Sequence, residues 1–150
     1  MAQSVRPIVV NRPRRHRAVV ADIMSAPVVT ISQSESLGSA WSLLAGSGLR
    51  HLVVVDGARC VGVVDDRKVV QAWPFGRLGF NRTIIAEVLE PRVRCVLPAT
   101  PVSIGARIML EEGVDALPVV SEQGTVVGVV TVADMLSFLA NVEIFSPVRK

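Results

Sequence analysis

The chain has 150 residues, 50% of them apolar, and a formal net charge of +3. Valine alone supplies 29 residues, a composition that favours strands and excludes intrinsic disorder of the whole chain. No apolar run approaches the roughly 18 residues that a membrane-spanning helix needs, and the N-terminus lacks the apolar stretch of a secretory signal. We therefore expect a soluble cytoplasmic protein.

The basic character of the chain comes from its N-terminus. Residues 1–19 contain five arginines and no acidic residue, and the rest of the chain has 11 bases and 13 acids. Such a tail could bind nucleic acid or an acidic partner, but no aromatic residue lies among its arginines to stack on bases. We expect a solvated, flexible tail and no nucleic-acid binding.

Three sequence blocks occur twice in the same order, which predicts an internal duplication. The first members of each pair begin at Val20, Gly48 and Val61, and the second members begin at Ile85, Gly113 and Val127. The offset is 65 residues for two pairs and 66 for the third, so a single residue is inserted in a turn. We divide the chain into a basic tail (1–19), a first repeat (20–72), a linker (73–84), a second repeat (85–141) and a C-terminal tail (142–150).

Each repeat has the pattern of an extended segment, a helix, two short strands and a closing helix. In the first repeat these are predicted at 28–31, 35–45, 52–55, 60–64 and 66–72. In the second repeat they are predicted at 93–97, 101–112, 117–120, 126–130 and 132–141. Ser34 and Thr100 are candidate N-caps of the first helices, and Gly48 and Gly113 would end them as left-handed C-caps.

The two predicted units are each too small to hold a good core of their own. Their valine runs are continuous rather than alternating, which is typical of strands that are buried on both faces. We therefore expect an α+β fold in which the two sheets pack against each other, with helices outside. The glycines and proline of the linker indicate an ordered loop, in which Trp73, Phe75 and Phe80 would cover the junction of the repeats.

The chain carries few residues that catalyse reactions or bind metals. Its two cysteines, Cys60 and Cys95, form no CxxC pair, and no Cys/His cluster accompanies them, so we predict no metal site and buried, structural thiols. The chain has no P-loop and no usable Ser/His/Asp set. Its one adjacent carboxylate pair, Asp65–Asp66, is accounted for by a helix N-terminus. An enzyme with a catalytic cofactor is therefore not expected.

The duplicated unit resembles the CBS domain, a family named after cystathionine β-synthase and found in tandem pairs. The resemblance covers roughly residues 19–140. It rests on the motifs ADIM, LRHLVVVD and GVVDDRKVV in the first repeat, and on DALPVV and GVVTVAD in the second. It implies two βαββα repeats packed pseudo-symmetrically as one CBS-pair module, which forms a homodimer through its helices, binds an adenosine compound between the repeats and regulates a partner protein.

The motif GVVTVAD also suggests a ribose and phosphate site on physical grounds. Gly128 allows a close approach of backbone, and the hydroxyl of Thr131 and the free N–H groups of the following helix can meet a phosphate. Asp134 can accept hydrogen bonds from both hydroxyls of a ribose. The alternative is a helix cap formed by Thr131 and Asp134, which the spacing alone favours. Within a duplicated CBS pattern the ligand interpretation is preferred.

The first repeat departs from this motif. Asp65 replaces the threonine and would repel a phosphate, and Lys68 replaces the aspartate and cannot accept a hydrogen bond from a ribose. The resemblance implies that this pair faces Asp115 and Ala116 across a second cleft. We do not expect that cleft to bind a nucleotide.

The resemblance implies that the other cleft combines the threonine and aspartate of the second repeat with segments of the first. Val28, Val29 and Leu49 would form an apolar slot for adenine. Arg50 and His51 would point at phosphates, where a guanidinium is the stronger donor. The candidate nucleotide-binding residues are therefore Val28, Val29, Leu49, Arg50, His51, Gly128, Thr131 and Asp134.

The leading hypothesis is a non-catalytic regulatory module that binds one AMP, ADP or ATP and signals through the geometry of its dimer or through its affinity for a partner. The alternative is a protein-interaction module whose clefts bind no nucleotide. The altered motif of the first repeat favours this alternative.

Overall fold

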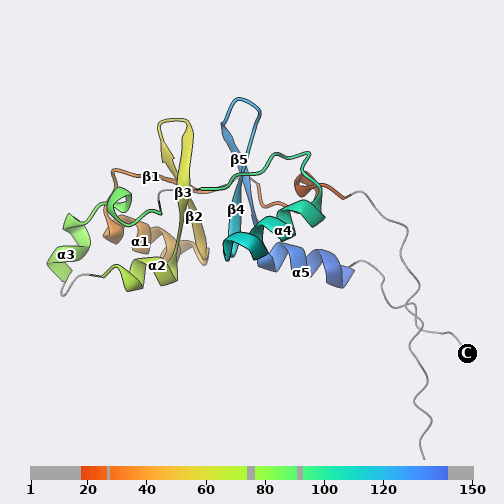
Figure 1. Cartoon of the computed structure of the whole chain (residues 1–150). Helices are drawn as coiled ribbons and strands as arrows, with labels where there is room; N and C mark the ends of the chain where they lie inside the picture. The colour runs from red at the N-terminus through yellow and green to blue at the C-terminus, as the bar shows by residue number, and fades with distance from the viewer. Residues whose placement is uncertain (1–17, 27, 74–76, 91–92, 142–150) are drawn as a thin grey trace, which may run out of the picture.

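A computed structural model describes residues 18–26, 28–73, 77–90 and 93–141 of the chain (Figure 1). The predictions for residues 1–17, for the C-terminal tail and for Phe75 concern residues outside these ranges. The first half contains β1 (Thr30–Ser32), α1 (Leu37–Ser47), β2 (His51–Asp56), β3 (Arg59–Asp65), α2 (Asp66–Gln71) and α3 (Arg77–Arg82). The second half contains α4 (Val102–Glu112), β4 (Ala116–Val120), β5 (Val126–Thr131) and α5 (Val132–Asn141).

The predicted α+β fold is confirmed. In the first half β1 runs parallel to β2, and β2 and β3 form an antiparallel hairpin. In the second half β4 and β5 form the corresponding hairpin. The helices α1 and α4 both end at glycines in the left-handed conformation, as predicted, with φ angles of 68° at Gly48 and 64° at Gly113.

The predicted N-caps of these two helices are wrong. The helix α1 begins later than expected, and Ser36 rather than Ser34 caps it, because the Ser36 hydroxyl accepts a hydrogen bond from the backbone of Ser39 at 3.1 Å. Thr100 instead holds a turn before α4, where its hydroxyl accepts a hydrogen bond from the backbone of Leu97 at 3.0 Å.

Two further predictions need correction. The segment 93–97 forms no strand but a single parallel bridge between Val96 and Val119, because the turn that begins at Leu97 takes the chain away from β4. The linker contains the helix α3 where we expected a loop, and α3 packs against α1. Next to it, the rings of Trp73 and Trp41 meet edge to face with centroids 6.5 Å apart. Nothing is described of the Phe80 side chain.

The two sheets face each other, as predicted, through a shared apolar layer. Val53 of β2, Ala116 of β4 and Val129 of β5 are buried together in this layer. At the tips of the hairpins, Arg59 and Thr125 form an antiparallel bridge. Figure 1 shows the two hairpins side by side, with α1 and α2 beside one of them and α4 and α5 beside the other. The ends of β2, β3, β4 and β5 that lie opposite the hairpin tips, next to the helices, therefore meet at one edge of the molecule.

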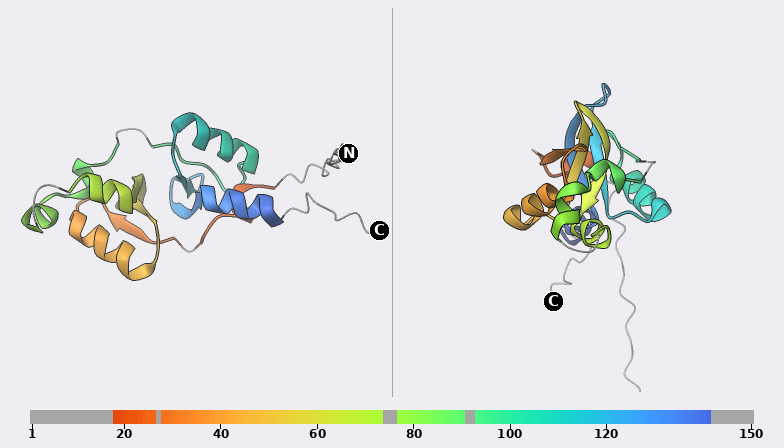
Figure 2. Two further views of the ribbon diagram at one scale, coloured as in Figure 1. Left: turned by 90° about the horizontal axis from the view of Figure 1, so that it is seen from below. Right: turned by 90° about the vertical axis from the view of Figure 1, so that its left-hand side faces the viewer.

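The two halves also exchange short 3₁₀ turns, η1 (Val20–Asp22) and η2 (Ile85–Glu87). Val20 precedes β1 in sequence but is fully buried in the core of the second half, where its N–H donates to the carbonyl of Thr100 at 2.8 Å. Ile85 is fully buried in the core of the first half, and its N–H donates to the carbonyl of Glu35 at 2.8 Å. Figure 2 shows the first described residues lying on the side of α5. Each half is thus completed by a turn from the other repeat.

Candidate functional site

A hollow of about 530 Å³ lies at the edge where the strand ends of the two halves meet. Its volume is in the range of pockets that hold nucleotide-sized ligands. The first half contributes Leu49, Arg50, His51, Asp65, Asp66 and Arg67 to its wall, and the second half contributes Asp115, Val129, Thr131, Val132, Ala133 and Leu136. The strand pairing explains this convergence, because His51 pairs with Asp65 at the end of one hairpin and Ala116 pairs with Thr131 at the end of the other.

Thr131 and Asp134 form a reciprocal helix cap at the start of α5. The backbone N–H of Thr131 donates to Asp134 Oδ2 at 2.8 Å, and the N–H of Asp134 donates to Thr131 Oγ1 at 3.2 Å. Neither side chain makes another hydrogen bond to a described residue. The cap therefore leaves the hydroxyl proton of Thr131 and the second carboxylate oxygen of Asp134 available, so cap and ligand contact are compatible.

The structure brings together four of the eight candidate nucleotide-binding residues. Leu49, Arg50, His51 and Thr131 line the hollow, whereas Val28, Val29, Gly128 and Asp134 do not belong to its wall. Val28 packs instead against the apolar layer between the sheets.

Gly128 allows another segment of the chain to pack closely against β5. A Cβ atom at this position would lie 2.7 Å from the sulfur of Met24 and 3.0 Å from the carbonyl oxygen of Ser25. Ser25 forms a bridge with Val129 of β5 and also lines the hollow. The glycine thus allows the segment that follows η1 to lie directly on β5, which shapes one wall of the site.

Two arginines contribute positive charge to the wall of the hollow, which also carries the carboxylates of Asp65, Asp66 and Asp115. Arg50 is exposed and was a candidate, whereas Arg67 was missed, although it directly follows Asp65–Asp66 at the start of α2. Neither guanidinium forms an ion pair with a described residue. Both can therefore bind an anion such as a phosphate without breaking an existing contact.

His51 lies half-buried at the start of β2. Burial lowers the pKa of its imidazole below the ordinary value of 6.5, while the nearby carboxylates of Asp65 and Asp115 act in the opposite direction. The net lowering of this pKa means that the ring is neutral at pH 7. We therefore expect His51 to act at this pH as a neutral donor or acceptor rather than as a cation.

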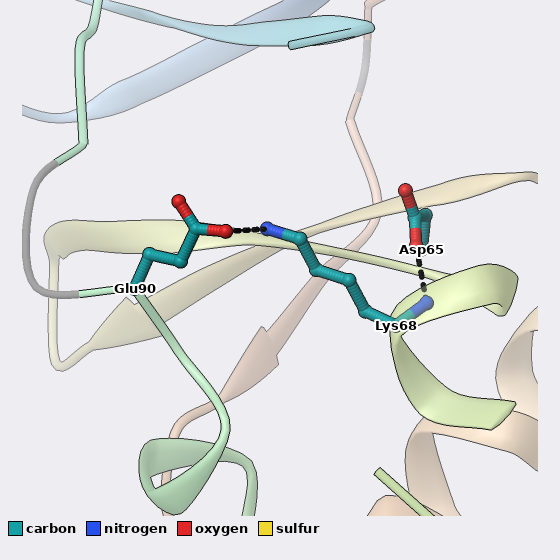
Figure 3. A network of polar contacts seen from close by, with 3 residues as sticks. All are labelled: Asp65, Lys68 and Glu90. Carbon is teal, nitrogen blue, oxygen red and sulfur yellow. Dashed lines mark hydrogen bonds and ion pairs between the residues drawn. The ribbon is translucent and has the colours of Figure 1, made fainter. Parts of the chain in front are cut away.

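In the opposite cleft, the corresponding space holds an ion pair between the two repeats. The Lys68 ammonium lies 3.8 Å from Glu90 Oε1, and the backbone N–H of Lys68 donates to Asp65 Oδ1 at 2.6 Å (Figure 3). Beneath this pair, Leu89 occupies the position over Gly62 that Met24 occupies over Gly128. The hollow lined by Lys68, Glu90 and Leu89 has a volume of about 70 Å³, and it adjoins a hollow of about 770 Å³ that Leu89, Glu90 and Arg94 also line.

A further hollow of about 270 Å³ brings together Asp65, Lys68, Asp115 and Ala116, the combination that the resemblance implied for the second cleft. It shares His51, Asp65, Arg67 and Asp115 with the larger hollow. The two hollows therefore adjoin each other at these strand ends. Sequence reasoning had treated them as separate, since the juxtaposition of Asp65 with Asp115 depends on how the two hairpins pack.

Comparison with known proteins gives a family match for most of the chain. The family model of the CBS domain matches twice, at residues 20–74 and 85–141. Among solved structures, the CBS domain pair of protein MJ0100, in complex with 5′-methylthioadenosine and S-adenosyl-L-methionine, has 27% sequence identity and a TM-score of 0.72. The alignment covers 82% of this chain and 96% of that one.

Two transport-protein matches were also found. The cytosolic domain of the Mg²⁺ channel MgtE, in complex with ATP, aligns with 28% identity and a TM-score of 0.67 over 80% of this chain and 48% of that one. The magnesium transporter MgtE of Thermus thermophilus is 38% identical over 87 residues, which is 58% of this chain and 18% of the transporter.

The curated relatives also include enzymes. The homoserine O-acetyltransferase of Methanococcoides burtonii is 27% identical over 117 residues, or 77% of this chain and 23% of the enzyme. The chain spans about a quarter or less of the first curated relatives that it matches. Within the described part of the chain, no helix is both long enough and apolar enough to cross a membrane.

Proposed function

Since the chain belongs to the CBS domain family and contains the domain twice, we propose that it is a non-catalytic regulatory module that binds one adenosine nucleotide in the 530 Å³ hollow between its repeats. The observation that carries this proposal is the composition of that hollow. Arg50 and His51 come from one repeat and Thr131 from the other, so a ligand that contacts all three bridges the two halves. Its binding free energy would then depend on their relative position.

The ligand chemistry follows from the side chains of the wall. Arg50 and Arg67 provide charged donors for phosphates. At the N-terminus of the ten-residue helix α5 the N–H groups of Val132 and Asp134 are already bonded, so the helix adds the N–H of Ala133. Asp134 keeps one carboxylate oxygen for a ribose hydroxyl. Leu49, which is 40% exposed and lines the hollow, is the proposed contact surface for adenine. These features favour AMP, ADP or ATP.

The solved relatives support a ligand of the adenosine class. The CBS pair of protein MJ0100 was solved with 5′-methylthioadenosine and S-adenosyl-L-methionine, and the cytosolic domain of MgtE with ATP. The first two ligands carry no phosphate group. Arg50 and Arg67 line the hollow and form no ion pair with a described residue, and two guanidinium groups suit a ligand with several phosphate oxygens.

We further propose that the output of the module is a change in the geometry of a homodimer or in the affinity for a regulated protein. Helix α5 has an exposed apolar stripe, with Val132, Leu136 and Leu139 at 38%, 60% and 52% exposure. Their spacing places them on one helical face. Leu136 also lines the nucleotide hollow, so a ligand there would contact the same helix that the dimer would use.

The second candidate function is a protein-interaction module that binds no nucleotide. The Lys68–Glu90 pair between the repeats and the complete helix cap at Thr131 favour this alternative, because both are formed without a ligand. Equilibrium dialysis of the full chain against labelled ATP separates the two candidates. The nucleotide proposal predicts saturable binding of one ATP per chain. If neither ATP, AMP nor S-adenosyl-L-methionine binds saturably, the protein-interaction module is the remaining candidate.

A further inference from the structure

Three side chains with metal-ligating atoms converge on the wall of the hollow from three strand ends. His51 begins β2, Asp65 ends β3, and Asp115 lies directly before β4. One ligand atom from each residue lies within 4.8 Å of those of the other two. His51 and Asp65 are half-buried, and Asp115 is exposed. An imidazole and two carboxylates, drawn from both repeats, therefore surround one point.

No hydrogen bond or ion pair links these three side chains to one another. Asp65 uses Oδ1 to cap α2, which leaves its Oδ2 oxygen, and neither the imidazole of His51 nor the carboxylate of Asp115 has a hydrogen-bond partner in the described part of the chain. Ligands held about 2.0–2.2 Å from one ion are at most about 4.4 Å apart. Small side-chain rotations are therefore enough to bring all three ligand atoms around a single ion.

The charges at this point favour a cation. The carboxylates of Asp65 and Asp115 are close enough to repel each other, and neither is neutralised by an ion pair with a described residue. Asp66 adds a third carboxylate to the same wall, which also carries Arg50 and Arg67. A divalent ion between the two carboxylates would remove their repulsion without displacing any existing contact.

We propose that His51, Asp65 and Asp115 bind one divalent transition-metal ion of the Mn²⁺ or Zn²⁺ type. One imidazole nitrogen and two carboxylate oxygens suit such ions, whereas Ca²⁺ and Mg²⁺ select oxygen ligands. Three protein ligands leave coordination positions open. If the nucleotide proposal also holds, these positions face the space assigned to its phosphates, and the ion would bridge protein and ligand. The cation site itself does not depend on the nucleotide.

The test is a titration of the full chain with Mn²⁺ alone, in which electron paramagnetic resonance measures the free ion. Mn²⁺ is the suitable probe because it prefers nitrogen and oxygen ligands and does not select the two thiols. The expected result is one bound Mn²⁺ per chain. His51→Ala, Asp65→Asn and Asp115→Asn should each weaken binding by at least roughly tenfold, the loss seen even for outer-shell partners of a metal. Asparagine at position 65 retains a cap for α2.

Asp56→Asn is the matched control. It removes the same charge from the same hairpin, but Asp56 is exposed at the opposite end of β2, and Mn²⁺ affinity should not change. Circular dichroism checks that each variant is folded. The proposal is overturned if wild type binds no Mn²⁺, if the three ligand variants bind as wild type does, or if Asp56→Asn weakens binding equally.

A parallel titration with ATP in metal-free buffer separates this proposal from the proposed function. ATP binding by a chain that takes up no Mn²⁺ overturns the cation site and leaves the nucleotide site standing. Mn²⁺ binding that is lost in the three variants, by a chain that binds ATP neither in metal-free buffer nor in the presence of Mn²⁺, supports the cation site and overturns the nucleotide proposal.

Discussion

Thr131 and Asp134 can serve a helix and a ligand at the same time. The reciprocal cap uses Thr131 Oγ1 as an acceptor and one of the two Asp134 carboxylate oxygens. A ribose or phosphate would use the hydroxyl proton and the other oxygen. The cap also fixes the rotamers of both side chains before a ligand arrives, which lowers the entropic cost of binding.

The role assigned to Arg50 can be tested with two ligands. Arg50→Ala should reduce ATP affinity by roughly tenfold to a hundredfold, because a hydrogen bond to a charged group contributes about 1.5–3 kcal/mol. Adenosine has no phosphate, so its affinity should change little. Isothermal titration calorimetry measures both. Arg59→Ala is the control, since Arg59 is an exposed arginine at the hairpin tip and outside the hollow. Equal losses for ATP and adenosine would contradict a phosphate contact.

The two cysteines differ from the buried, inert thiols that the sequence suggested. Both are half-buried and free and lie beside each other across the two repeats, and the Cys60 thiol donates to the carbonyl of Gly62 at 3.9 Å. The neighbouring Cys95 thiol lowers the pKa of the Cys60 thiol to about 7. The same contact raises the pKa of Cys95, which keeps its proton. Sequence spacing gave no signal of this pair, because the contact forms only when the repeats pack.

Alkylation should therefore depend on pH in a defined way. Cys60 reacts as its thiolate, so its rate with iodoacetamide should rise as the pH increases through about 7 and level off above it. Cys95→Ala removes the neighbouring thiol, so it should raise the Cys60 pKa and slow its alkylation at pH 7 by roughly tenfold. Peptide mapping by mass spectrometry gives the rate at each site. An unchanged Cys60 rate in the Cys95→Ala variant would contradict this account.

At the scale of elements, the sequence predicts most of the strands and helices to within two residues. Long valine runs and the glycines that end α1 and α4 are strong local signals, and α5 begins and ends where it was predicted. Local signals fail where tertiary contacts decide the outcome. The helix α3 forms against α1 despite its glycine, and the segment 93–97 loses its strand to a neighbouring turn.

The exchange of turns between the halves predicts cooperative unfolding. Ile85→Ala removes a fully buried side chain of the second repeat from the core of the first half, and should lower the free energy of unfolding by about 2–5 kcal/mol. Because each half contains a turn from the other repeat, urea denaturation should remain a single transition with a lower midpoint. Two separate transitions, with a lower midpoint in Ile85→Ala for only one of them, would show that the halves unfold independently.

At the scale of the whole molecule, the composition of the cleft was only partly predictable. The duplication indicated that segments of both repeats meet, and Leu49, Arg50, His51 and Thr131 do line one hollow. The position of Arg67 and the convergence of His51, Asp65 and Asp115 depend on the packing of two hairpins, which no local pattern encodes.

The apolar stripe of α5 supplies a test of the proposed dimer. Sedimentation of wild type should give about twice the chain mass of 16.1 kDa. Leu139→Asp places a charge on the stripe and should shift the protein to the monomer, because burying an unpaired charge in an interface is costly. Ser137→Asp is the control, since Ser137 lies on another exposed face of α5. A wild-type monomer, or an unaffected dimer in Leu139→Asp, would contradict this assembly.

The central claim is that one cleft binds a nucleotide and the other does not, and calorimetric titration of ATP into two variants tests it most directly. Asp134→Ala removes the proposed ribose acceptor and should weaken ATP binding by roughly tenfold to a hundredfold. Lys68→Ala removes the ion pair with Glu90 in the opposite cleft and should leave ATP affinity nearly unchanged. Asp134→Asn, which retains a cap acceptor, separates loss of the ligand contact from loss of the helix cap. Loss of ATP binding in Lys68→Ala with full binding in Asp134→Ala would contradict the assignment of the cleft.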